Sequence, residues 1–134
     1  MATIVFTSAL TINNAGIYQN AAPTSKTQTV ESTLTHAHHT TQSIGASYEE
    51  VSVGDVSQAK QYVVRLQNRD AAVDVLLQIQ GTGPVSVPFG VMKPGEPFMC
   101  RMAAQSGGYP KLMMYAASTV NVEVVVGEAG DPTA

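Results

Sequence analysis

The sequence predicts an all-β protein, built as a single antiparallel β-sandwich or small barrel. Apolar residues alternate with a period of two in almost every segment, which places them on one face of a strand. Turn signals made of Gly, Pro, Asn and Asp separate these segments at intervals of about 8 to 12 residues, as in known sandwiches. At 134 residues the chain is long enough for one domain with a core of its own.

The N-terminal region begins with a clear strand pattern and then loses it. Residues 2–13 read "ATIVFTSALTIN", and "NNAG" at 13–16 reads as a turn because Asn and Gly tolerate positive φ. Residues 17–28, "IYQNAAPTSKTQ", are polar and irregular, and we expect a loop or an extended arm. We expect the apolar residues of this region to contact other chains: Ile4, Phe6, Leu10 and Ile12 on one face of the strand, followed by Ile17 and Tyr18.

Alternation resumes after the arm and continues to the C-terminal region. Residues 29–41 suit one long strand or two shorter ones, and further strands are expected at 49–53, 61–67, 73–80, 84–91, 98–104, 111–117 and 119–127. Residues 56–69 are the one stretch that could form a helix. The alternation of Tyr62, Val64 and Leu66 favours a strand there. The apolar residues Val85, Val87, Phe89 and Val91 are expected on a single face.

Two turns have recognisable chemistry. In "KPGE", Pro94 supplies a fixed φ at the second position and Gly95 the positive φ at the third, which is typical of a type II turn closed by Glu96. Gly54 and Asp55 form a second turn signal between the strands at 49–53 and 61–67.

The composition excludes several classes of protein. Charged residues make up 13% of the chain against an apolar fraction of 44%, and the net charge is −3 with a pI near 5.4. Nucleic-acid binding needs clustered Lys and Arg, which are scattered here. We expect no membrane span and no signal peptide, because no apolar run approaches about 20 residues. A surface poor in charge favours a chain packed against other chains.

Three histidines lie within four positions, at His36, His38 and His39. On a strand His36 and His38 share a face and could bind zinc, but a site needs a third ligand and usually a fourth. Candidates such as Glu31 or Glu49 are present, but nothing in the sequence places them nearby. The alternatives are a site shared between symmetry mates at an oligomer axis and three ordinary neutral side chains. We predict no metal and no cofactor.

The remaining reactive residues do not suggest an enzyme. Glu49 and Glu50 are adjacent, so on a strand they point apart, and Asp70 and Asp74 are explained by a solvated turn. Cys100 is the single cysteine and lies in an apolar run, which favours a buried thiol. The methionines of the C-terminal half fill a core or line an adaptable interface.

From about Gln42 to Gly127 the chain resembles a family of small structural proteins of tailed bacteriophages. The matching segments, in order, are "SIGASYEE", Gly54-Asp55, "YVVRLQ", Asn68 and Asp70, "VDVLLQIQ", "VPFGVMKPGE" and "VNVEVVVGE". The family commonly has Asn-x-Asp-x-x-Asn after the central strand, and Val73 stands here in place of the last Asn.

The resemblance implies a jelly-roll-like sandwich and a role in the virion, which is assembled in the host cytoplasm. We expect a capsid decoration or cement protein that bridges major capsid subunits, and a homo-oligomer, either a dimer or a trimer. A neck, tail or fibre-base component and a ligand-binding sandwich are the alternatives. The domains predicted are an arm at 1–30, a sandwich at 31–127 and a flexible tail at 128–134.

Overall fold

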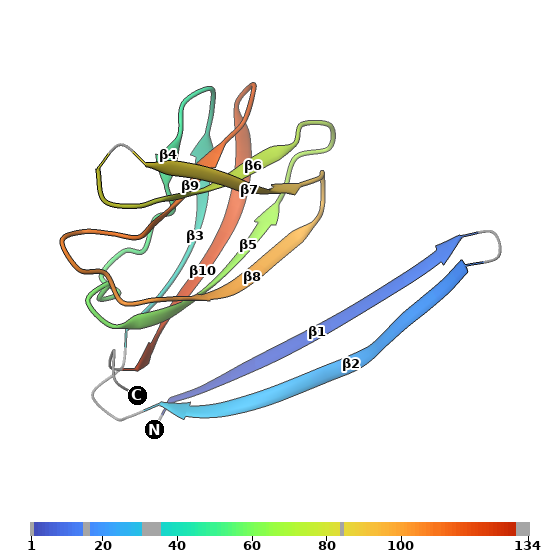
Figure 1. Ribbon diagram of the computed structural model, residues 1–134, viewed down its shortest axis with the longest axis horizontal. Helices are drawn as coiled ribbons and strands as arrows, with labels where there is room; N and C mark the ends of the chain where they lie inside the picture. Colours follow the sequence, from blue (N-terminus) through green and yellow to red (C-terminus); the bar gives the residue numbers. More distant parts are fainter. Residues whose placement is uncertain (1, 15–16, 31–35, 84, 131–134) are drawn as a thin grey trace. The chain divides into compact units, whose positions relative to one another are not determined.

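The computed structural model describes residues 2–14, 17–30, 36–83 and 85–130, and in these ranges it forms strands joined by turns, without a helix (Figure 1). The strands are β1 (Ala2–Asn14), β2 (Ile17–Val30), β3 (Ala37–Ile44), β4 (Glu49–Glu50), β5 (Gln61–Asn68), β6 (Val75–Gln80), β7 (Ser86–Met92), β8 (Pro97–Met102), β9 (Lys111–Tyr115) and β10 (Val120–Gly130). All pairings are antiparallel. The predicted all-β sandwich is confirmed.

The chain divides into two compact units, Met1–Leu34 and Thr35–Ala134. The predicted tail at 128–134 begins too early, because β10 continues to Gly130 and both Glu128 and Ala129 are buried. The last four residues of that tail lie outside the described ranges.

The first unit is a hairpin of β1 and β2. Of the two alternatives expected for 17–28, the loop is wrong and the extended arm agrees with the structure, because this segment pairs with β1 along its length, from Asn14 opposite Ile17 to Ala2 opposite Val30. The register shifts between Ser8 and Leu10, where Ala22 and Pro23 lie on the opposite strand. A bulge is expected here, because Pro23 has no N–H to donate to the neighbouring strand. Of the predicted turn, Asn13 and Asn14 belong to β1, and residues 15 and 16 lie outside the described ranges.

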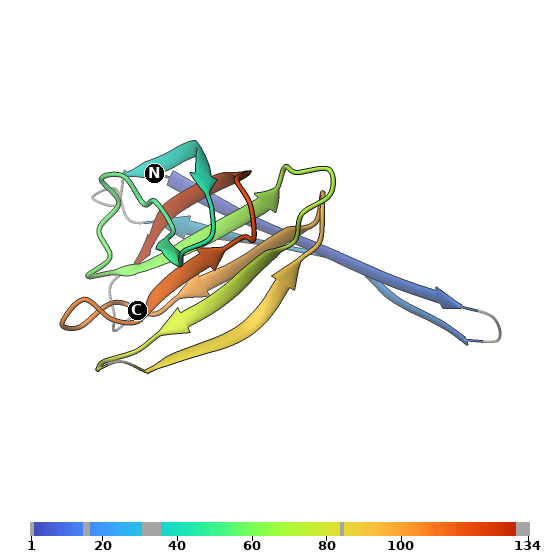
Figure 2. The same cartoon turned by 90° about the horizontal axis from the view of Figure 1, so that it is seen from above.

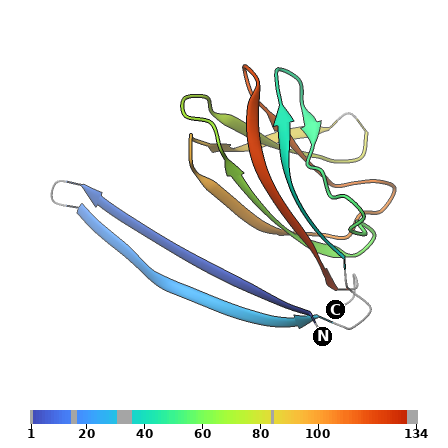
Figure 3. The same cartoon turned by 180° about the vertical axis from the view of Figure 1, so that it is seen from behind.

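The second unit is a sandwich of two four-stranded sheets with the orders β3-β10-β5-β8 and β4-β9-β6-β7 (Figure 3). The pairings are nested: β3 pairs with β10, β4 with β9, β5 with β8 and β6 with β7. The eight strands therefore form one long antiparallel hairpin that is wound into two layers.

The core lies between these two sheets. In β5 every second residue is buried, including Tyr62, Val64 and Leu66, so the choice of a strand over a helix at 56–69 is confirmed for 61–68. The central strand β10 contributes alternate valines, and β6 and β9 contribute Leu77 and Met114. Among the described residues, every buried hydrophobic side chain belongs to the second unit.

Some predicted strands are shorter than expected. The segment 49–53 pairs only at Glu49 and Glu50, after which Val51 turns into the core and its N–H bonds to the carbonyl of Leu112. The segment 29–41 contains the end of β2 and the beginning of β3, so the alternative of two strands is confirmed for the residues described.

The "KPGE" turn has the predicted geometry. Gly95 has φ +81°, and the N–H of Glu96 donates to the carbonyl of Lys93 at 2.9 Å. The Glu96 carboxylate also accepts a bond from the N–H of Lys93. The turn joins β7 to β8, which are the last strands of the two different sheets, so it closes one side of the sandwich.

A search of the described residues for helices long and apolar enough to cross a membrane finds none.

Candidate assembly surfaces

The β1–β2 hairpin exposes apolar side chains. Val5 is 58% exposed and Leu10 is 62% exposed. The other hairpin side chains that the structure describes, those of Thr7, Ser8, Ala9 and Ser25, are exposed as well. Leu10 is one of six residues predicted to contact other chains. The backbone of the other five lies within β1 and β2: Ile4, Phe6, Ile12, Ile17 and Tyr18. An isolated two-stranded hairpin is marginally stable in water, so this hairpin stands to gain from a partner surface.

A second apolar surface is formed by Val85 and residues of β7, and β7 lies at the margin of its sheet (Figure 2). Val85, Val87 and Phe89 are 58%, 55% and 47% exposed, and we call these three residues the β7 flank. Val87 pairs with Ile79, which packs against the core, so the flank continues the core-facing side of the sheet. The centroids of the Phe89 ring and of the Phe98 ring on β8 are 5.7 Å apart, so this contact joins the two sheets.

The prediction that Val85, Val87, Phe89 and Val91 share one face is wrong for the end of β7. Leu77 pairs with Gly90 and Gln78 with Pro88, so Phe89 is an extra residue in a β-bulge. One extra residue moves everything beyond it to the opposite face. Val91 therefore pairs with Leu76 on the outer face, and Met92 becomes the buried residue of this strand.

Each of the three histidines contacts different residues. His36 Nδ1 is 3.2 Å from Glu128 Oε1, and its Nε2 is 3.7 Å from Asp55 Oδ2. His38 Nε2 is 3.4 Å from the Ser52 hydroxyl. His39 has turned to the outer face of the sheet. Within the described ranges, no three His, Cys, Asp or Glu side chains are grouped to hold a metal ion.

Gly54 lies against His38. It has φ +58°, and a Cβ at this position would be 2.5 Å from His38 Nδ1. The Gly54-Asp55 turn therefore requires glycine for two reasons, the left-handed backbone and the lack of space.

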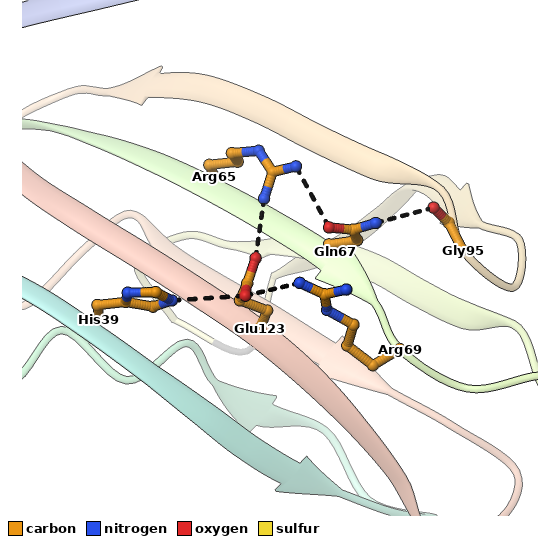
Figure 4. A network of polar contacts seen from close by, with 6 residues as sticks. All are labelled: His39, Arg65, Gln67, Arg69, Gly95 and Glu123. Carbon is orange, nitrogen blue, oxygen red and sulfur yellow. Dashed lines mark hydrogen bonds and ion pairs between the residues drawn. The ribbon is translucent and has the colours of Figure 1, made fainter.

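Glu123 on β10 is the centre of a polar network on the outer face of the β3-β10-β5-β8 sheet (Figure 4). Its carboxylate accepts bonds from Arg69 at 2.7 Å and from Arg65 at 3.1 Å, and His39 Nε2 lies 3.5 Å away. Arg69 is the main cause that lowers the pKa of Glu123. The network joins strands β3, β10 and β5, and the side chain of Gln67 extends it to the carbonyl of Gly95.

Asn68 is fully buried at the end of β5 and joins three segments. Its side-chain amide donates to the carbonyls of Val73 at 2.8 Å and Met92 at 3.0 Å, and its oxygen accepts from the N–H of Asp70 at 2.9 Å. The Asn68 carbonyl also accepts from the N–H of Gly95. The structure therefore brings together the predicted turn residues at 68–70 and 94–96.

The carboxylates that could have formed a catalytic pair are engaged separately. Asp70 accepts bonds from the N–H groups of Ala72 and Val73, and these bonds lower its pKa. Asp74 is paired with Lys93 at 2.8 Å, and this contact raises the pKa of Lys93. Cys100 is partly buried rather than buried as predicted, and this burial raises the pKa of its thiol, so less of the reactive thiolate is present.

The methionines of the C-terminal half differ in their burial. Met92, Met102 and Met114 are buried in the core, whereas Met99 is 39% exposed on β8.

No family model matches the chain, and neither a curated protein nor a solved structure matches it significantly.

Proposed function

We propose that this chain is a structural protein of a bacteriophage virion, a capsid decoration or cement protein that bridges neighbouring chains on the shell. The hairpin of β1 and β2 is the observation that carries the proposal. It has no buried side chain among those described, and it exposes Val5 and Leu10 to water. Apolar area removed from water by a partner chain stabilises the complex by roughly 25 cal/mol per Å² before the costs of association.

The sandwich supports the same proposal. Its nested strand pairing is the order in which a jelly roll winds, and this architecture is common among capsid proteins. The turn and strand segments that resemble tailed-phage structural proteins all lie in this unit. The low content of charge, 13%, suits a surface that is covered by other chains.

A cement protein works by adding contact area where shell subunits alone bury too little. Each contact is modest, but many copies on one particle multiply it. In this proposal the partners are the major capsid protein or other virion proteins, and the hairpin reaches across to them.

Binding to particles assembled without this chain tests the proposal. Two arm variants are used: a deletion of residues 2–28, and Val5→Asp combined with Leu10→Asp. The control variant, Ala117→Asp with Thr119→Asp, adds the same charges at exposed positions of the β9–β10 turn. We expect the control to bind like the parent, and the arm variants to bind at least about tenfold more weakly.

If the arm variants bind as tightly as the parent, the hairpin is not the attachment device. A copy number of only a few chains per particle would instead favour the neck, tail or fibre-base alternative.

A further inference from the structure

We propose that the β7 flank binds the β1–β2 hairpin of a second copy of this chain. The proposal rests on the proposed function only in taking the hairpin as an arm that acts between chains. Val85, Val87 and Phe89 are core-type side chains left half exposed at the margin of the sandwich. The flank therefore already has the chemistry of a protein interior, but no element of the described sandwich covers it.

The flank is built for contact through side chains rather than for an added strand. The N–H of Gly81 bonds to the carbonyl of Val85 at 2.9 Å, so by antiparallel alternation the nitrogen of Pro88 faces the free edge of β7. Pro88 has no N–H to offer there, and the bulge at Phe89 breaks the regular spacing of the edge. Both features disfavour pairing with another strand.

The hairpin has the complementary properties. Its two strands already pair with each other, so the backbone groups along their shared edge are bonded and those along the two outer edges can bond to water. What it lacks is a cover for the exposed side chain of Leu10, which lies among uncharged neighbours. Val5 is five positions away on β1 and therefore points to the opposite face, so one contact would cover one of the two. A preformed hairpin that packs on the flank would bury apolar area of the hairpin and of the flank.

Charge matches the two surfaces to each other. Residues 1–25 and residues 75–92 contain no Asp, Glu, Lys or Arg, as is also true of residues 35–48, 102–110 and 112–122 of the sandwich. Contact between these two segments would bury no charge, and burying an unpaired charge is the largest penalty in an interface. A partner with charged contact residues would find no counter-charge on either segment.

Because the two surfaces differ and lie on the same chain, the contact repeats from copy to copy. Such a heterologous contact closes into a ring when the rotation between copies allows it. Reciprocal exchange of hairpins between two copies is the smallest closed form, and a three-membered ring is the next.

The mass of the purified full-length chain in solution, measured by light scattering during size exclusion, tests the proposal. We expect a discrete oligomer of the parent and of the control Ala117→Asp with Thr119→Asp. Leu10→Asp in the arm and Val87→Asp in the flank should each weaken association at least about tenfold. The milder Leu10→Ser and Val87→Thr serve if either aspartate variant loses the cooperative melting of the sandwich. A monomeric parent at tens of micromolar would overturn the proposal.

Mixing the two variants identifies the contact. Leu10→Asp keeps an intact flank and Val87→Asp keeps an intact arm, so together they should form a one-to-one complex through a single good contact. A mixture that stays monomeric, or self-association of Leu10→Asp alone, would show that hairpin and flank are not partners. A monomeric parent that still decorates particles would refute this inference alone, and an oligomer absent from particles would refute the proposed function alone.

Discussion

Asn68 joins three segments of the sandwich through its side chain. It is fully buried, yet its side chain has a partner for each hydrogen it donates and for its oxygen. The three bonds hold the end of β5 to the loop before β6 and to the end of β7. Unlike an apolar contact, this arrangement accepts only a side chain with donors and an acceptor at these positions.

Asn68→Asp should be strongly destabilising. It removes the donors to the carbonyls of Val73 and Met92 and places a carboxylate in a buried site. We expect the free energy of unfolding, measured by urea denaturation, to fall by about 2–4 kcal/mol. The same substitution at the exposed Asn121 should change it by no more than about 0.5 kcal/mol. Equal effects at the two positions would mean that the Asn68 bonds do not determine stability.

Gly54→Ala separates backbone strain from lack of space. Gly54 and Gly83 both have positive φ, but only at Gly54 would a Cβ meet a neighbour, the ring of His38. Gly83→Ala should cost on the order of 1 kcal/mol from the backbone alone, and Gly54→Ala clearly more. Combining Gly54→Ala with His38→Ala should recover the difference in thermal stability. If the double variant is simply additive, the contact with His38 is not the cause.

At the scale of elements, β10 holds its sheet together through both of its faces. Its buried valines pack into the core, while Glu123 on the outer face joins β3 and β5 through His39, Arg65 and Arg69 (Figure 4). The free energy from the outer face depends on pH, because the carboxylate must be ionised to accept these bonds.

Glu123→Gln should be destabilising at neutral pH and close to neutral in acid. The folded protein lowers the pKa of Glu123 below its ordinary value of 4.5, so its contribution is complete above that pH and is lost as the pH falls through the folded pKa. The measurement is the urea midpoint of parent and variant between pH 7 and pH 2. In an Arg69→Gln background the difference at pH 7 should shrink. A difference that does not change with pH would contradict this account.

The elements also show where sequence patterns were sufficient. Strands that pack into the core, such as β5 and β6, follow the alternation of their apolar residues, because burial on one face selects that pattern. β2 has no such pattern and is held by pairing with β1, so its sequence looked like a loop. The bulge at Phe89 arises from the register between β6 and β7, which one strand's sequence does not contain. Similarly, the Glu123 network needs three strands side by side before its residues meet.

At the scale of the whole molecule, the chain combines a sandwich that has a core with a hairpin whose described side chains are all exposed. The buried hydrophobic residues of the described chain all belong to the sandwich, whereas Val5, Ala9 and Leu10, the apolar side chains described for the hairpin, are exposed. The turns at 54–55, 68–70 and 93–96 could be predicted from local chemistry. The surfaces proposed for assembly could be predicted only in part. The apolar pattern of the arm is visible in the sequence, but exposure of the β7 flank depends on where each sheet ends.

The central claim is that the chain acts on a virion shell through its N-terminal hairpin. Cryo-electron microscopy of purified particles that contain this chain tests it most directly. We predict the sandwich on the outside of the shell in many copies, on the order of hundreds for a multivalent cement, with each hairpin lying against a neighbouring chain. Particles in which the chain is absent from the shell, or in which its hairpin contacts no neighbouring chain, would contradict it.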